Sequence, residues 1–340
     1  MTQPSPCSLA AAALVTALLP TVSIAAEVNV YTSREPALIK PALDAFAQSA
    51  GIKVNTVFIQ NGLEERVKAE GANSPADLIL TVDAAKLINA ADLGLLQKPA
   101  AALPESAITP NLRDPQGRWS AITLRSRVVY ASKERVKDNA ITYEDLADPK
   151  WKGKICMRSG QHPYNISLIA AFIAHHGAEK TEAWLRGVKA NLAKKPSGGD
   201  RDVAKDILAG VCDIGLGNTY YVGLMLKDKD PQQRAWGAAI KVMDTTFKGN
   251  GTHVNISGAG IAKDAPNKAN AEKLLVFLLG DQAQSLLATL NDEYPVRAGV
   301  AAVQTEKLFG PLKPDSLALT DIAAQRKLAS ELVDKVGFDQ

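Results

Sequence analysis

The chain has 340 residues, of which 46% are hydrophobic and 22% charged, and its formal net charge at pH 7 is +3. This composition is that of a soluble globular protein with ample core, and the length suggests two domains. So small a charge, with no clustered basic stripe, argues against a nucleic acid as partner.

The N-terminal segment has the pattern of a secretory signal. Residues 8–26, SLAAAALVTALLPTVSIAA, are apolar and uncharged, and they end in small side chains before the polar start EVNVYTS. We interpret residues 1–26 as a signal peptide cleaved near Ala25 or Ala26. The usual basic n-region is missing, since MTQPSPCS contains no Lys or Arg, so the signal is atypical. A retained membrane anchor is the alternative. Cys7 precedes the apolar run and does not fit a lipoprotein cysteine.

The next part of the chain alternates strand and helix patterns. Period-two apolar runs alternate with helical periodicity, and Gly51 and Gly71 are typical helix stops. This order predicts a parallel sheet with helices on both faces. The expected strands are 28–33, 52–59 and 76–83, and the expected helices are 36–51, 63–71 and 84–94.

A second α/β unit follows residues 118–132, RWSAITLRSRVVYAS, which we expect to form one or two strands. We then expect a short helix and turn at 142–154, strands at 155–159, 211–217, 241–247 and 253–263, and helices at 164–177, 181–192, 202–210, 269–290 and most of 302–340.

The sequence contains no Pro-rich linker, so the chain most simply passes between two lobes on strands, at 122–131 and near 250–262. We expect an N-terminal lobe of residues 27–127 plus about 252–302, and a C-terminal lobe of 128–251 plus about 303–340. Ligands of such sheets bind at the C-terminal ends of strands, against helix N-termini. Two facing lobes therefore predict a cleft.

Two cysteines remain after signal cleavage, Cys156 and Cys212, both in short strand-like runs. An even count in an exported protein predicts one disulfide, and adjacent strands would bring the two residues together. Two buried free thiols are the alternative. A zinc site or a cysteine nucleophile is not expected, because no Cys-x-x-Cys is present.

Three tyrosines occupy matching positions at strand ends. Tyr164 begins the helix after the strand ICMRS, and Tyr220 and Tyr221 follow the strand VCDIGLG, with Asn218 or Thr219 placed to cap the next helix. Phenols that converge on one point suit a hard, highly charged cation such as Fe(III), which can displace the phenol proton. The alternative is that they are half-buried aromatics with hydrogen-bonded tips.

The sequence resembles the periplasmic ferric-binding proteins, the substrate-binding subunits of bacterial iron(III) ABC transporters. The resemblance is carried by six stretches: VNVYTSREP (28–36), GANSPADLILTVD (71–83), MRSGQHPYNISL (157–168), KPSGGDRD (195–202), GNTYYVG (217–223) and FKGNGTHVNISGAGIAK (247–263).

This resemblance implies a class II, two-lobed periplasmic binding-protein fold with a hinged cleft, in which each lobe is a mixed, mainly parallel sheet flanked by helices. It also implies iron ligation by Tyr164, Tyr220 and Tyr221 without catalysis. The protein is then a periplasmic monomer that delivers Fe(III) to an ABC permease in the inner membrane.

One departure concerns the first lobe. Some relatives have a His-Tyr pair after the Ser-Arg of the first strand, whereas this chain has Glu35 and Pro36. Glu35 is a possible substitute ligand, and a solvated loop charge is the alternative. A synergistic anion such as carbonate becomes the expected co-ligand. Arg125 is the first choice to bind it, with Arg34 above the cleft and Arg127 on the face of Arg125 as further candidates; structural salt bridges are the alternative for each.

Two other classes of function are alternatives. A binding protein of the same fold for an oxyanion or a polyamine would use helix N-termini and arginines, or carboxylates and aromatic walls. An exported enzyme is not expected, because the sequence has no G-x-S-x-G, H-E-x-x-H or P-loop motif. His162, two residues before Tyr164, is expected to orient the site or cap the helix.

Overall fold

The computed structural model describes residues 1, 26–100, 103 and 108–340. All of the predicted signal peptide except its first and last residues lies outside this part of the chain. Within the described residues, every helix is too short or too polar to span a bilayer.

The first half of the chain forms the predicted strand–helix alternation. β1 (Glu27–Thr32) pairs in parallel with both β2 (Lys53–Phe58) and β3 (Leu78–Thr81). The connecting helices are α1 (Pro36–Ala50), α2 (Leu63–Glu70) and α3 (Ala84–Asp92). α1 starts with a proline and ends at Gly51, whose φ of 66° is left-handed, as the sequence predicts.

One long strand, β5 (Trp119–Ser132), connects the two ends of the sheet. Its residues 119–126 pair antiparallel with β11 (Val254–Ala262), and residues 127–131 pair antiparallel with β8 (Ile214–Asn218). The strand order is β2-β1-β3-β11-β5-β8-β7, where β7 is Ile155–Cys156. The sheet is therefore mixed, and the sequence pattern of 118–132 corresponds to a single strand.

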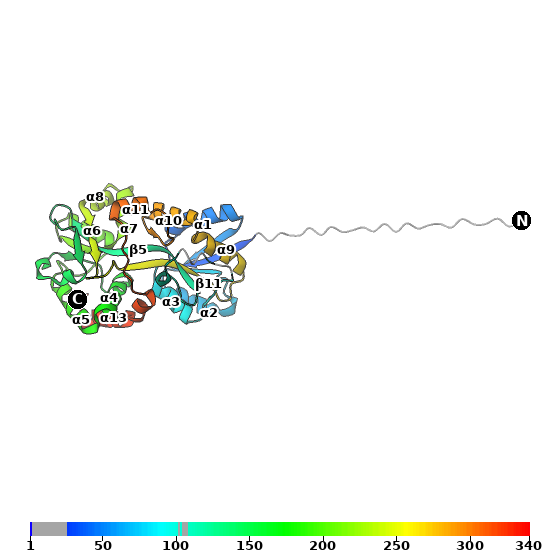
Figure 1. Ribbon diagram of the computed structural model, residues 1–340, viewed down its shortest axis with the longest axis horizontal. Coiled ribbons are helices and arrows are strands. Elements are labelled where there is room, and N and C mark those ends of the chain that lie inside the picture. Colours follow the sequence, from blue (N-terminus) through cyan, green and yellow to red (C-terminus); the bar gives the residue numbers. More distant parts are fainter. Residues whose placement is uncertain (2–25, 101–102, 104–107) are drawn as a thin grey trace.

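Helices cover both faces of the sheet. In Figure 1, α1, α9 (Lys268–Leu278) and α10 (Asp281–Asn291) lie on one side of β5 and β11, and α2 and α3 lie on the other. At the other end of the molecule, the strands separate a group with α6 to α8 from a group with α4, α5 and α13. These helices are α4 (Pro163–His176), α5 (Ala178–Ala190), α6 (Asp200–Leu208), α7 (Thr219–Lys227), α8 (Pro231–Ala239) and α13 (Arg326–Lys335).

Short elements complete the chain: β4 (Leu96–Gln97), β6 (Ala140–Thr142), β9 (Ile240–Val242), β10 (Asp244–Thr246), β12 (Tyr294–Pro295), α11 (Val303–Phe309) and α12 (Leu319–Ala324).

Several expected elements differ in detail. The strand predicted over 241–247 is two strands, β9 and β10, and the strand predicted over 155–159 is limited to β7. The helix predicted over 269–290 is two helices that meet at Gly280, and the helix predicted within 142–154 is two 3₁₀ turns, at 144–147 and 149–151. The strand predicted from residue 211 starts at Ile214, so Cys212 lies just before it.

The predicted disulfide is present. Cys156 and Cys212 are bonded, with their Cα atoms 5.8 Å apart. Both belong to a small apolar cluster beneath α6, α7 and α8 that also contains Tyr130, Val222 and Met225. Because Val222 and Met225 are buried side chains of α7, this cluster fixes the helix that carries Tyr220 and Tyr221.

Candidate metal-binding site

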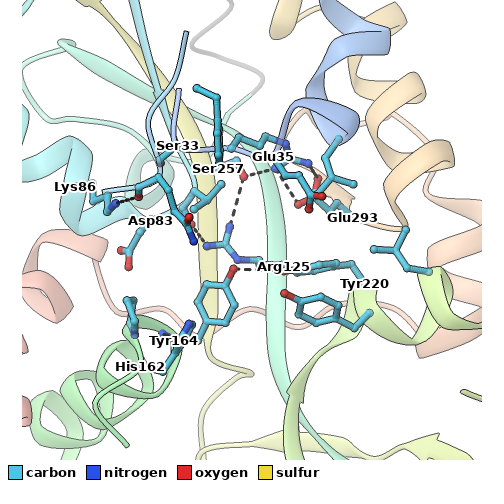
Figure 2. A pocket seen from close by; sticks show the side chains of 18 of the residues that line it. Ser33, Glu35, Asp83, Lys86, Arg125, His162, Tyr164, Tyr220, Ser257 and Glu293 are labelled. Carbon is cyan, nitrogen blue, oxygen red and sulfur yellow. Dashed lines mark hydrogen bonds and ion pairs between the residues drawn. The ribbon is translucent and has the colours of Figure 1, made fainter. Parts of the chain in front are cut away.

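The three predicted tyrosines meet at one point. Tyr164 lies in the first turn of α4, and Tyr220 and Tyr221 lie in the first turn of α7. The hydroxyl oxygens of Tyr164 and Tyr220 are 3.4 Å apart, and the ring centroids of Tyr220 and Tyr221 are 4.3 Å apart. Figure 2 shows the phenols of Tyr164 and Tyr220 converging beside Arg125. Residues 56 positions apart in the chain thus bring their oxygens together.

The turn before α7 is fixed by close packing. The hydroxyl of buried Tyr130, on β5, donates a hydrogen bond to the carbonyl of Asn218. Its ring lies against Gly217, where a Cβ would come within 2.1 Å of the ring. Any larger residue at 217 would displace the strand end, so the glycine is required by this contact.

A buried carboxylate connects the two tyrosine-bearing turns. Asp200, at the start of α6, accepts hydrogen bonds from the Arg127 guanidinium at 2.9 Å and from the backbone N–H of Asn218 at 2.9 Å. Arg158 also contacts it, at 3.3 Å. Arg127 further donates to Asn165, the neighbour of Tyr164, at 2.8 Å. Four segments are therefore held by one ion-pair network.

In this network Arg127 forms a structural salt bridge with Asp200, which is the alternative to anion binding that the sequence left open. The geometry therefore does not favour Arg127 as an anion ligand. It also explains why α7 is not capped as expected. The side-chain oxygen of Asn218 accepts from Arg127 at 3.0 Å, so no side chain caps the helix. The first N–H groups of α7 are left for another partner.

A cavity of about 440 Å³ opens in front of the tyrosines. All three tyrosines line it, together with His162, Arg125 and Arg201. The opposite wall comes from the ends of β1 and β3 and from the segment after α10, and it includes Ser33, Arg34, Glu35, Asp83, Lys86 and Glu293. The cavity thus lies where the strand topology predicts a ligand.

Arg125 is the buried cation of this cavity without a carboxylate partner. It is only 3% exposed, and the described part of the chain shows no ion pair for it. Its guanidinium donates to the carbonyl of Val82, lies 3.5 Å from the Ser257 hydroxyl oxygen, and is 5.3 Å from the centroid of the Tyr164 ring. A buried charge with so little compensation favours an anion nearby.

Arg34 differs in this respect. Its guanidinium makes a two-pronged ion pair with Glu293, at 3.1 and 2.5 Å, and it also donates to Ser257. Both side chains are buried, at 2% and 3% exposure. Arg34 therefore lines the cavity with its charge already balanced. Glu35, the proposed substitute ligand, is exposed at the N-cap of α1, where its side chain makes no capping bond.

The phenols of Tyr220 and Tyr221 keep their protons until a cation displaces them. Burial, reinforced by the negative charge that Tyr164 would carry, raises the pKa of Tyr221 to about 12 and the pKa of Tyr220 well above its ordinary value. A weakly polarising ion cannot overcome this preference near neutral pH, whereas a small, highly charged one can. The site thus favours small metal ions of high charge.

His162 caps α4, as the sequence allowed. Its Nδ1 accepts from the N–H of Tyr164 at 3.2 Å, and the two rings meet edge to face at 4.7 Å. Burial, together with the positive charge of Arg158, lowers the pKa of His162 to about 4, so the ring is neutral. Because Nδ1 is the acceptor, Nε2 carries the ring proton.

Besides Lys86 and Arg201, sequence reasoning missed four charged residues of the site: Asp83, Asp200, Glu293 and Arg158. Asp83 had a readable signal, since it precedes an apolar helix and its carboxylate accepts from Ala85 N–H as an N-cap. The other three have no local signature, because their partners are distant in sequence. Among the described residues, no cluster of three His, Cys, Asp or Glu side chains is arranged to hold a metal.

The profile of the family "Bacterial extracellular solute-binding protein" matches residues 73–313. Iron uptake protein A1 of Synechocystis sp. (strain ATCC 27184 / PCC 6803 / Kazusa) is 40% identical over 314 residues, which cover 92% of this chain and 87% of that protein. The chain belongs to this solute-binding protein family. Similarity to this iron uptake protein and to the ferric binding protein described next confirms the ferric-binding family predicted from the sequence.

Two solved solute-binding proteins show the same fold. The Bordetella ferric binding protein is 59% identical with a TM-score of 0.86, covering 92% of this chain and 100% of its own. A Trichodesmium protein in complex with iron and citrate ligands is 39% identical with a TM-score of 0.86, covering 92% of this chain and 99% of its own. The predicted α/β periplasmic binding-protein fold is confirmed, and membership of this family makes the chain a binding protein and not an enzyme.

Proposed function

We propose that this solute-binding protein is a periplasmic iron(III) carrier that captures Fe(III) through the phenolates of Tyr164, Tyr220 and Tyr221. The observation that carries the proposal is the convergence of three phenols from two helix N-termini on one cavity, with two hydroxyls 3.4 Å apart. Similarity to proteins named for iron uptake and for ferric binding supports it.

The chemistry of the donors selects the metal. Phenolate is a hard oxygen ligand, so it disfavours soft metals. Three phenolates balance the charge of Fe(III), whereas with a divalent ion they would leave a net negative charge in a half-buried site. The raised pKa of Tyr220 and Tyr221 strengthens this selection, because only a strongly acidic cation releases their protons near neutral pH.

An anion beside Arg125 completes the proposed coordination. Arg127 and Arg34 are engaged by Asp200 and Glu293, which leaves Arg125 as the unpaired cation next to Tyr164. The uncapped N–H groups of α7 lie beside the same phenols and favour negative charge. A small dianion such as carbonate fits this position. Citrate is the corresponding choice suggested by the Trichodesmium complex.

Glu35 is the proposed donor from the opposite wall of the cavity. Its carboxylate is hard and exposed, and it lines the cavity across from the tyrosines. We propose that residues 27–127 plus about 252–302 and residues 128–251 plus about 303–340 move as the two lobes, hinged on β5 and β11. Closure of these lobes on the metal would bring Glu35 toward it.

The cellular role follows from this chemistry and the family. A signal peptide at residues 1–26 would export the protein to the periplasm, where it would act as a monomer. It would present the iron-loaded, closed form to an ABC permease of the inner membrane. No nucleic acid takes part.

An oxyanion-binding protein is the second candidate, favoured by the unpaired Arg125 in the cavity. A polyamine is less favoured, because the buried carboxylates of the cavity, Asp83 and Glu293, already contact Arg326 and Arg34.

Single Tyr→Phe variants test the proposal. Tyr164, Tyr220 and Tyr221 are each replaced, and Tyr31→Phe serves as the control, since the Tyr31 hydroxyl bonds Glu70 away from the cavity. Equilibrium competition against a chelator is expected to show weaker Fe(III) binding for the three site variants and no change for the control. Equal affinity in all four would refute tyrosine ligation.

A further inference from the structure

Asp292 has an unusual backbone. It follows α10 with φ 54° and ψ 35°, and it is the one non-glycine residue with positive φ in the described part of the chain. Its N–H closes the helix by bonding to the carbonyl of Ala288. Glycine or asparagine would serve this turn with less backbone cost. The carboxylate is therefore expected to have a purpose of its own.

The carboxylate is directed onto α7, the helix of Tyr220 and Tyr221. Asp292 is 0% exposed, and its two oxygens lie 2.7 and 2.9 Å from the Lys227 ammonium. It also lies directly against Gly223, where a Cβ would come within 2.1 Å of Oδ2 and 2.4 Å of Cγ. Only glycine at 223 allows this approach.

These contacts fall on one face of α7. Tyr220, Gly223 and Lys227 are spaced i, i+3 and i+7, which places them in one row along the helix. Asp292 thus contacts the row that begins with the Tyr220 phenol. The distance between α7 and Asp292 therefore sets the position of the Tyr220 phenol.

The residues after Asp292 are anchored to the opposite side of the cavity. Glu293 forms the buried ion pair with Arg34. Tyr294, in β12, pairs with Leu124 of β5, next to Arg125. Residues 292–294 therefore link three parts of the structure. The Asp292 side chain contacts α7, the Glu293 side chain pairs with Arg34 after β1, and the Tyr294 backbone pairs with β5 beside Arg125.

We propose that Asp292 is a positioning residue for metal binding, which holds α7 at the depth where Tyr220 and Tyr221 face Tyr164 and Arg125. This inference rests on the proposed function, because positioning is read out through bound iron. Asp292 itself contacts α7 at Gly223 and Lys227, does not line the cavity, and is not proposed as a ligand.

A size exchange across the contact tests the inference. Gly223→Ala places a methyl where Oδ2 now lies, and overpacking of this kind is expected to lower the Fe(III) affinity by about tenfold or more. Asp292→Gly suits the left-handed backbone but removes the contact, and we expect the affinity to fall by about threefold. The double variant gives the methyl the vacated space, so its affinity should lie closer to wild type than either single variant.

Gly187→Ala is the matched control. Gly187 is also a glycine within a helix, in α5, and its Cβ would lie 2.7 Å from the Cβ of Ala147, outside the cavity. It should lower the melting temperature without changing the Fe(III) affinity or the phenolate absorption band. All variants are measured at a temperature where circular dichroism shows them folded.

The outcomes are separable. Wild-type protein that binds no Fe(III) would overturn the proposed function, and this inference with it. Iron binding by wild type together with unchanged affinity in Asp292→Gly and Gly223→Ala would overturn the inference alone. A loss in Gly223→Ala that Asp292→Gly does not relieve would also overturn it, because the methyl would then act through another neighbour.

Discussion

Replacement of Tyr221 by phenylalanine should reduce by one the number of protons that the protein releases when it binds Fe(III). The Tyr221 pKa of about 12 means that the phenol is fully protonated at pH 7. Ionising it there costs about 7 kcal/mol, which the metal must supply. Each ligating phenol therefore releases one proton, and three ligands release three.

The same linkage fixes the sign and size of the pH effect. At pH values below the raised pKa of Tyr220 and Tyr221, these phenols are protonated in the iron-free protein. Acidification therefore changes only the competition between protons and iron for the phenol oxygens. With three phenolates, the Fe(III) affinity should fall by about a thousandfold for each pH unit of acidification. Tyr221→Phe should reduce this slope to about a hundredfold.

The assay is a potentiometric titration in weakly buffered solution with ferric nitrilotriacetate as the iron source. The difference between wild type and Tyr221→Phe cancels protons from the chelator and from the anion. Tyr31→Phe, which leaves the cavity intact, should release as many protons as wild type. An equal proton count for wild type and Tyr221→Phe would refute phenolate ligation by Tyr221.

Three further outcomes are expected. Arg125→Met should abolish the dependence of Fe(III) affinity on added bicarbonate or citrate, measured by chelator competition, whereas a persistent dependence would place the anion elsewhere. Asp200→Asn should lower the free energy of unfolding by about 3 kcal/mol in urea titration, because it leaves buried Arg127 without its carboxylate; a change below experimental error would contradict the network. Replacing Cys156 and Cys212 by serine should lower the free energy of unfolding by about 4 kcal/mol, since their bond spans a separation of 56 residues. Unchanged stability would contradict a stabilising role for this disulfide.

Much of the fold could be predicted because the signals are local. Alternating runs, helix-stop glycines and Pro36 at the start of α1 specify the parallel strands β1, β2 and β3. The break at Gly280 was missed, because the apolar periodicity continues across it and only the tertiary packing separates α9 from α10. A strand of two residues, such as β7, is likewise defined by its neighbour β8 and not by its own sequence.

The tyrosines of the site were predictable for a related reason. Tyr164, Tyr220 and Tyr221 each follow a strand, and strand ends of one sheet lie at one edge. The charges around them were not predictable. Whether Arg34, Arg125 or Arg127 is free depends on Glu293 and Asp200, whose approach is set by tertiary structure.

The most direct test of iron capture by tyrosine is a visible absorption spectrum of the mature, metal-stripped protein titrated with chelated Fe(III). Phenolate bound to Fe(III) gives an orange-to-red charge-transfer band. Tyrosine ligation predicts a band that saturates at one iron per chain and weakens in Tyr221→Phe. Absence of the band near neutral pH would contradict it, and the cavity would then have to be assigned to another ligand.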